Sequence, residues 1–474
     1  MRRRLMGLVK AVSRVRGGGT TMVRRATSAV LRLVLAAALL LAPVTPAGAQ
    51  SRGHQPEFIR DAEIEHIIRT LAGPIFAAAG IDGEAVEFAL IKDSTINAFV
   101  AGGMNMFLYT GLLMECDNAE QLIGVMAHES GHIAGGHLIR GREAMEQASA
   151  EAILAMILGV GAAIASGQGN AAGAIITGGQ GMAERNLLAF SRAQEASADA
   201  AGMRFLDAAH ISTQGFHDFL EKLAGQELLP PDRQAAYTRT HPLTRDRIDA
   251  VADHLRDSPW KNSHPSAAFN DLFARLKAKL IGFIKPTLAL RRYGPEDTGI
   301  PARYARAVAF YQQGDLKTAL PLIDGLIAQE PKNAYFYELK GQVLMENRRI
   351  PDSLPPYRRS VELAPESGLL RGALAQALLE TGNPQYLDEA IKQLQFATRQ
   401  EKDSAFLWRL VATAWGRKNN DGMVSYALAE EALARGDRAM ARHQAERAEK
   451  MLPAGSPGWL RAQDIRGVVD RHNN

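Results

Sequence analysis

Two histidines four residues apart, His128 and His132, could together bind one metal ion. On an α-helix, residues at this spacing lie on the same face, so both imidazole rings can reach the same point. Glu129 is rotated by about 100° around the helix, which places its carboxylate beside the ion rather than on it. From there Glu129 could take a proton from a zinc-bound water. The segment HESGH therefore predicts a hydrolytic zinc site, although so short a motif also occurs on ordinary surface helices.

A third ligand is available farther along the chain, in the segment SRAQEASAD at 191–199. A catalytic zinc ion takes three protein ligands and keeps one position open. Glu195 and Asp199 are four residues apart on a predicted helix, so they share a face. We expect Glu195 to complete the ligand set for one Zn²⁺ per chain, and Asp199 to accept the second ring N–H of a ligand histidine. The alternative, a solvated charged face, is disfavoured by the presence of both motifs.

These two segments, together with THPLTRDRI at 240–248, resemble the HtpX-type zinc metallopeptidases. The sequence is most similar to the periplasmic, BepA-like branch of that family, whose members carry tetratricopeptide repeats. The resemblance covers roughly residues 57–255 and the repeat region behind them. It implies that the two histidines of HESGH and Glu195 bind zinc, and that Glu129 is the catalytic base.

Short strands are expected ahead of the zinc helix at 85–91, 97–101 and 106–110, after a helix at 55–79. Peptidases of the resembled family keep a small sheet in this place, and its edge strand can pair with an extended peptide. Asn97, Ala98 and Phe99 are our candidates for this substrate-binding edge. The alternative is a strand whose side chains only fill the core.

His241 is a further candidate catalytic residue, in a segment where the resembled family carries a histidine. It could donate a hydrogen bond to the oxyanion of the tetrahedral intermediate, or occupy zinc's open position when no substrate is bound. A structural role near the start of a helix is the alternative. His137 lies off the face that carries the ligand histidines, and we expect it to be structural.

The first 49 residues are typical of an export signal. They hold nine of the 55 Lys and Arg residues and none of the 51 Asp and Glu residues. Their apolar run at 33–42 is too short to span a bilayer, and the small residues 47–49 form a cleavage site. Met22 fits the start of a signal of ordinary length, and an uncleaved anchor is the alternative. The single Cys116 excludes a disulfide within the chain, which is compatible with a periplasm-like space.

The segment 151–182, between the two zinc motifs, is rich in alanine and glycine and contains long uncharged stretches. Each apolar arm is shorter than a membrane-spanning helix, so we expect a helical hairpin. Two roles stay open for this hairpin. It could contact a membrane surface or cover the active-site cleft, or it could simply be buried within the fold.

A 34-residue period is typical of tetratricopeptide repeats, whose stacked helix pairs form a concave groove. The period is carried here by Pro331 and Pro365 and by the turn residues Gly314, Arg348, Gly382 and Gly436. An irregular helical bundle is the alternative. The expected domains are the signal at 1–49, a peptidase domain at 50–257, a connector at 258–300 with a helix at 267–284, and the repeats at 301–474.

These features predict a mostly α-helical protein, in which a zincin-like α+β metallopeptidase domain with a small sheet precedes an α-solenoid. The resemblance implies an exported zinc endopeptidase of the periplasm that hydrolyses misfolded or misassembled envelope and outer-membrane proteins. Its repeats would bind clients or the outer-membrane assembly machinery. The alternative is a repeat-based chaperone or adaptor with a latent or structural zinc site. Without the signal the chain has a net charge of −5, which gives no support for nucleic-acid binding.

Overall fold

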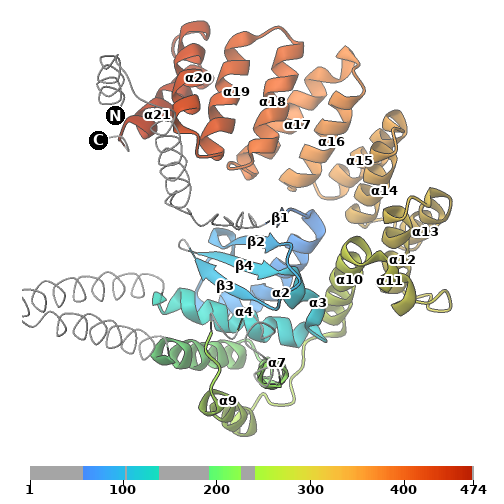
Figure 1. Ribbon diagram of the computed structural model, residues 1–474, viewed down its shortest axis with the longest axis vertical. Coiled ribbons are helices and arrows are strands. Elements are labelled where there is room, and N and C mark those ends of the chain that lie inside the picture. Colours follow the sequence, from blue (N-terminus) through green and yellow to red (C-terminus); the bar gives the residue numbers. More distant parts are fainter. Residues whose placement is uncertain (1–56, 102–103, 138–191, 226–236, 238–240, 472–474) are drawn as a thin grey trace, which may run out of the picture. The chain divides into compact units, whose positions relative to one another are not determined.

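The computed structural model describes residues 57–101, 104–137, 192–225, 237 and 241–471 (Figure 1). The predicted export signal and the predicted hairpin at 151–182 lie outside these ranges. Among the helices within the ranges, none has both the length and the apolar character that crossing a bilayer requires.

A four-stranded sheet lies in the N-terminal part of the described chain, with the strand order β1-β2-β4-β3 (Figure 1). The strands are β1 (Phe58–Ile59), β2 (Glu87–Ile91), β3 (Ala98–Ala101) and β4 (Asn105–Tyr109). β2 and β4 run parallel, whereas β1 and β3 are antiparallel to their neighbours. Alternate residues of a strand point to one face, and one face here is buried through Phe88, Leu90, Ala98, Val100, Met106 and Leu108. β3 is an edge strand, as expected for the segment that contains Ala98.

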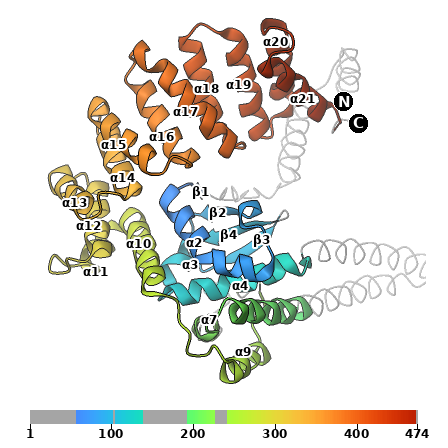
Figure 2. The same cartoon turned by 180° about the vertical axis from the view of Figure 1, so that it is seen from behind.

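The other elements of this domain are helices. They are α2 (Ala62–Ala79), α3 (Thr110–Glu115), α4 (Ala119–Ala134), α7 (Gln214–Ala224), α9 (Arg245–Asp257) and a further helix at residues 192–208. In Figure 2, α2 lies in front of the sheet, and α4 contacts both α2 and β3. Every residue of α4 from Ala119 to His132 is buried. A helix without an exposed face belongs to the interior, so the HESGH motif lies inside the domain.

The first helix is shorter than predicted. The sequence favoured a helix over 55–79, whereas α2 begins at Ala62 because Asp61 caps it. The carboxylate of Asp61 accepts a hydrogen bond from the backbone N–H of Ile64 at 2.9 Å. Phe58–Ile59 pair instead with β2. The three predicted strands begin and end within two residues of β2, β3 and β4, and β1 was not predicted.

The segment 258–300 is largely helical. It contains α10 (Ala267–Ile284), at the residues predicted for a helix, and α11 (Pro286–Arg292). α10 contributes Phe273 and Leu276 to the hydrophobic core around the sheet. It also packs closely on the first repeat helix, because a Cβ at Gly282 would lie 2.8 Å from Cβ of Val308. α10 therefore packs against both the peptidase core and the repeats.

The repeat region consists of consecutive helices (Figure 1). They are α12 (Ile300–Gln312), α13 (Leu316–Gln329), α14 (Ala334–Glu346), α15 (Ile350–Leu363), α16 (Gly368–Glu380), α17 (Leu387–Gln400), α18 (Ala405–Arg417), α19 (Asp421–Ala434), α20 (Arg438–Met451) and α21 (Pro457–Arg471). Three further hydrophobic cores lie mainly between these helices, and α12 also contributes Ala305 and Ala309 to the core around the sheet. The mostly helical class, with a small sheet followed by helical repeats, is confirmed.

The turns within the first four helix pairs share one backbone conformation. Gly314, Arg348, Gly382 and Asn419 have positive φ angles and follow one another at intervals of 34, 34 and 37 residues. The last interval is longer because it includes the short 3-10 helix Pro384–Tyr386. Asn419 was not predicted, since asparagine can adopt this conformation without being glycine. Gly436, which was expected in this series, lies instead between α19 and α20.

Candidate metal centre

The two helices that carry the candidate ligands approach each other closely. α4 carries His128 and His132, and the helix at 192–208 carries Glu195. A Cβ at Gly131 would lie only 2.5 Å from the carbonyl oxygen of Ala198, so a residue with a side chain would push the helices apart. The glycine in HESGH is therefore part of what brings Glu195 within reach of the histidines.

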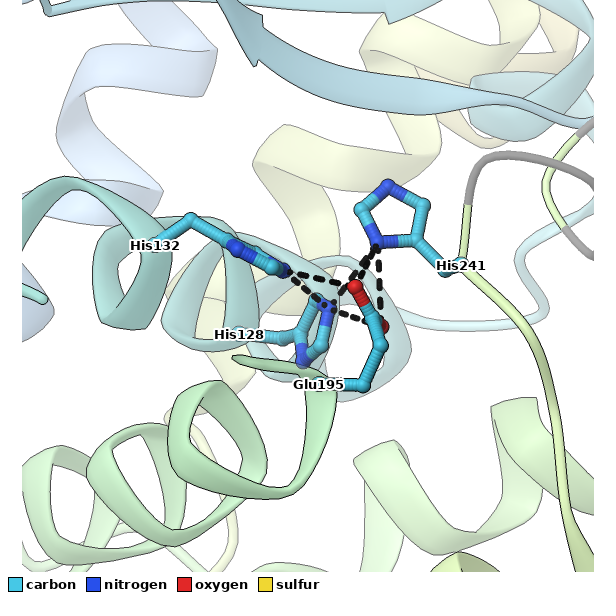
Figure 3. A group of neighbouring side chains, drawn as sticks. All are labelled: His128, His132, Glu195 and His241. Carbon is cyan, nitrogen blue, oxygen red and sulfur yellow. Dashed lines mark hydrogen bonds and ion pairs between the residues drawn. The ribbon is translucent and has the colours of Figure 1, made fainter. Parts of the chain in front are cut away.

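Four side chains converge in the interior of the domain: His128, His132, Glu195 and His241 (Figure 3). All four are buried, and one potential ligand atom from each lies within 4.8 Å of the others. Nε2 of His132 is 3.1 Å from Nε2 of His128 and 3.3 Å from a carboxylate oxygen of Glu195. Imidazole nitrogen and carboxylate oxygen are good ligands for divalent transition metals. The group therefore fits a metal ion.

Glu129 lies beside this group and is fully buried. Neither of its carboxylate oxygens has a hydrogen-bond partner among the described residues. Its Oε1 is 3.4 Å from Nε2 of His241. A buried carboxylate without hydrogen bonds is costly, and its cost is offset if a water or a substrate donates to it. Glu129 is thus available as a proton acceptor.

A second layer of charged groups supports the ligands. Oδ1 of Asp199 is 2.8 Å from Nδ1 of His128, the contact that the sequence led us to expect. Arg247, at the start of α9, donates two hydrogen bonds to Asp199 at 2.6 and 2.8 Å, and a third to the carbonyl of Pro242. Its Nη1 is also 3.0 Å from Glu195. One guanidinium thus balances both buried carboxylates.

These contacts shift the pKa values of the group. Burial by itself lowers the pKa of His128, but its hydrogen bonds to Asp199 and Glu195 outweigh burial and raise the pKa to about 9. Burial raises the pKa of Glu195, but hydrogen bonds from the histidines hold it well below its usual range. Burial lowers the pKa of His132. A metal binds only the neutral imidazole, so metal binding and protonation of His128 compete at this site.

His241 connects the group to the edge strand. Its Nδ1 is 3.2 Å from Glu195 and 3.3 Å from Nε2 of His128, and its Nε2 is 3.1 Å from the carbonyl oxygen of Ala98. The ring of Tyr237 stacks on His241 with centroids 4.5 Å apart. The backbone N–H of Tyr237 donates to the carbonyl of Ile96 at 3.0 Å.

The candidate substrate-binding residues are placed partly as expected. Asn97 and Ala98 are buried, and Phe99 stacks on Phe107 of β4 with ring centroids 4.7 Å apart. The carbonyl of Asn97 accepts a hydrogen bond from β4. Neighbouring residues of a strand point their backbone groups to opposite sides, so the carbonyl of Ala98 faces the free edge, where His241 lies. The side chains of Asn97 and Ala98 are buried, that of Phe99 is half-buried on the opposite face of the sheet, and the backbone carbonyl of Ala98 faces the candidate metal centre.

Two residues of this region were not predicted, Arg247 and Tyr237, whereas His137 was expected to be structural but not to contact His132. Arg247 lies in the segment THPLTRDRI, but Arg245 lies there too, and the sequence does not tell which arginine turns inward. Tyr237 carried no signal, because its stacking on His241 depends on the tertiary fold. His137 contacts the ring of His132 from the side that faces away from the group.

Comparison with known proteins agrees with this geometry. Residues 59–255 match peptidase family M48, and residues 304–368 match a tetratricopeptide repeat model. The β-barrel assembly-enhancing protease of Yersinia pestis is 26% identical over 377 residues, covering 77% of this chain and 74% of the relative. The protein of the same name from Escherichia coli strain K12 is 27% identical over 394 residues, covering 80% and 77%.

A shorter relative matches only the peptidase part. The metalloprotease LoiP of Escherichia coli strain K12 is 30% identical over 180 residues, covering 37% of this chain and 64% of the relative. The two domains and the longer relatives lead to one assignment. The chain carries a family M48 peptidase domain followed by tetratricopeptide repeats, and it is a metalloendopeptidase homologous to the β-barrel assembly-enhancing proteases.

Proposed function

We propose that this metalloendopeptidase binds one Zn²⁺ through His128, His132 and Glu195, and that Glu129 is its catalytic base. The observation that carries the proposal is the convergence of these buried ligand atoms beside a buried carboxylate that has no hydrogen-bond partner among the described residues. Two imidazoles and one carboxylate, with a position left open, form a known type of catalytic zinc site.

The mechanism is hydrolysis of a peptide bond. When bound, zinc lowers the pKa of water towards about 7 and polarises the scissile carbonyl. Glu129 accepts the proton of the attacking water and later passes it to the leaving amide nitrogen. Asp199 holds the ring of His128 through Nδ1, and Arg247 holds Asp199. The burial of the group excludes bulk water, which strengthens each of these electrostatic interactions.

His241 has two candidate roles, and its hydrogen bond to Ala98 bears on both. With Nε2–H donating to that carbonyl, Nδ1 presents its lone pair to the group. His241 would then be a fourth ligand that excludes water in the resting enzyme. Alternatively, His241 turns towards substrate and donates to the oxyanion.

Replacing His241 with alanine separates these two roles. At equal zinc loading, the variant should cleave faster than the parent if His241 blocks the site. It should cleave more slowly, by about 10²–10³-fold, if His241 is an oxyanion donor. Unchanged cleavage would leave His241 with a structural role only.

The relatives and the repeats support a proposal for the setting of the reaction. The relatives are named for the assembly of β-barrels, and tetratricopeptide repeats bind protein substrates or partners. We infer that the enzyme is exported to the periplasm, where it cuts misfolded or misassembled outer-membrane proteins. Its repeats would bind these clients or the assembly machinery. The predicted hairpin at 151–182 would add contact with a membrane surface or cover the cleft.

One observation favours a second function. His241 supplies a fourth potential ligand atom, and a metal with four protein ligands is a closed, non-catalytic site. The chain would then act mainly as a chaperone or adaptor for outer-membrane proteins, with a latent zinc site. The position of Glu129 argues against this alternative, since a structural metal has no use for a buried base.

Metal analysis combined with a cleavage assay tests the proposal. The purified protein should contain one zinc ion per chain and should cut an unfolded β-barrel protein. Glu129→Gln should keep the zinc and lose hydrolysis, because an amide cannot accept the proton. Cleavage at the wild-type rate by this variant would refute the role of Glu129. Stoichiometric zinc without cleavage by the wild type would support the adaptor.

A further inference from the structure

His137 lies against the outer nitrogen of His132. It follows Gly136, whose φ of 59° turns the chain at the end of α4, and only 6% of its surface is exposed. Nδ1 of His137 is 3.1 Å from Nδ1 of His132, and the two rings are nearly perpendicular. Nε2 of His132 points the other way, towards His128 and Glu195. His137 is thus outside the group of potential ligands but in contact with one of them.

This contact fixes which nitrogen of His132 carries the proton. A neutral imidazole has one N–H, and a metal takes the lone pair of the other nitrogen. Because Nε2 of His132 faces the group, its Nδ1 must hold the proton. That N–H can donate only to a lone pair, so Nδ1 of His137 is the acceptor, and the proton of a neutral His137 is on Nε2.

The position of His137 is itself determined by its neighbours. A Cβ at Gly135 would lie 2.4 Å from Nε2 of His137, so glycine at this position leaves room for the ring. The side-chain amide of Gln194 donates a hydrogen bond to the backbone carbonyl of His137 at 3.0 Å. Gln194 directly precedes Glu195, so His137 links the two segments that carry the candidate ligands.

We propose that His137 is a positioning residue of the metal centre, which accepts a hydrogen bond from Nδ1–H of His132 and thereby orients that ligand. The inference rests on the proposed zinc site. The two ligand histidines are then supported unequally, since His128 donates to the carboxylate of Asp199 whereas His132 donates to an imidazole. Charge-assisted hydrogen bonds are roughly twice as strong as neutral ones. His132 is therefore the more weakly supported ligand.

Zinc affinity tests this role. The full-length protein with His137 replaced by Ala, Asn or Gln should be titrated with zinc against a chelator of known affinity. Partners of ligand histidines contribute about 10–100-fold to metal affinity, and we expect the lower end for His137→Ala because its hydrogen bond is neutral. The carbonyl oxygen of Asn lies close to where Nδ1 of His lies, whereas that of Gln lies nearer Nε2. His137→Asn should therefore recover most of the affinity, and His137→Gln should not.

A control and a second readout complete the experiment. His254→Ala removes a partly buried histidine of α9 that pairs with Asp207, and it should leave zinc affinity unchanged. The visible spectrum of the cobalt-substituted protein should shift in His137→Ala, with one metal still bound per chain. If His137→Ala does not fold, the zinc affinities of the Asn and Gln variants still test whether an acceptor at the place of Nδ1 supports His132. Equal zinc affinity in Asn, Gln and wild type would overturn the inference and leave the proposed function intact. A wild-type chain without stoichiometric zinc would instead refute the proposed function.

Discussion

Replacing Arg247 with methionine should strongly destabilise the peptidase domain. The guanidinium is buried, donates to Asp199 at 2.6 and 2.8 Å, and lies 3.0 Å from Glu195. Methionine keeps most of the apolar stem but removes the charge and all the donors. Asp199 and Glu195 would then lose the guanidinium that they contact, while the packing around them changes little.

The expected loss can be estimated from these contacts. Removing one partner of a buried ion pair costs about 3–5 kcal/mol. In a domain of roughly 150–250 residues, each kcal/mol lowers Tm by about 2–4 °C. The metal-free variant should therefore unfold about 6–20 °C below the parent. The loss should be smaller with metal bound, because a cation held by Glu195 replaces part of the missing charge.

Thermal unfolding followed by circular dichroism, with chelator and then with zinc, measures this effect. Arg256→Met is the matched control, because Arg256 lies on the same helix but its side chain is 65% exposed. Exposed ion pairs contribute little, so its Tm should stay at the parent value. Adding Asp199→Asn to Arg247→Met should recover about 1–3 kcal/mol, since the unpaired buried charge is then gone. If Arg247→Met and Arg256→Met both unfold at the same temperature as the parent, Arg247 does not stabilise the site electrostatically.

Two further predictions concern the rest of the chain. Burial raises the pKa of Cys116 from 9.0 to about 12, so its thiol should resist maleimide at pH 8 until the protein unfolds. Between about pH 9 and 12 only the unfolded chain loses this proton, so this group makes stability fall as pH rises there. In Cys116→Ala, Tm should fall less steeply with pH over this range. An unchanged dependence of Tm on pH would show that other groups cause the fall. A repeat fragment of residues 266–474, which keeps α10, should unfold at a higher temperature than one of residues 301–474, because Gly282 packs against Val308. Equal unfolding temperatures would show that α10 stabilises the peptidase domain alone.

The parts of the site that sequence could predict are those set by local geometry. His128 and His132 share a helix face whatever surrounds them, and Glu195 and Asp199 do the same on their own helix. The 34-residue period likewise reports helix pairs that contact mainly their neighbours. In each case the spacing along the chain is enough, because the contact is made within one helix or between adjacent ones.

The missed parts depend on contacts between distant segments. Nothing near Arg247 in the sequence shows that it turns inward while Arg245 stays exposed. The contact of His137 with His132 requires the turn at Gly135 and Gly136, which the sequence shows only as two glycines. The start of α2 was also misjudged, since apolar spacing continued upstream while strand pairing decided the structure there.

Tyr237 and His241 already bond to the edge of β3 that does not pair with β4. The carbonyls of Ile96 and Ala98 point to the free edge of β3, where an extended substrate would pair. Both already accept hydrogen bonds, from the backbone of Tyr237 and from Nε2 of His241. Each such hydrogen bond contributes about 0.5–1.5 kcal/mol net. A substrate that donates N–H groups to the same two carbonyls therefore replaces the hydrogen bonds from Tyr237 and His241 and restores the free energy lost when they break. On the proposed function, a substrate strand that takes the carbonyl of Ala98 also removes the contact that holds His241 towards the metal site. An extended chain would then activate the enzyme that cuts it, whereas a folded protein, which offers no free strand, would leave the site closed.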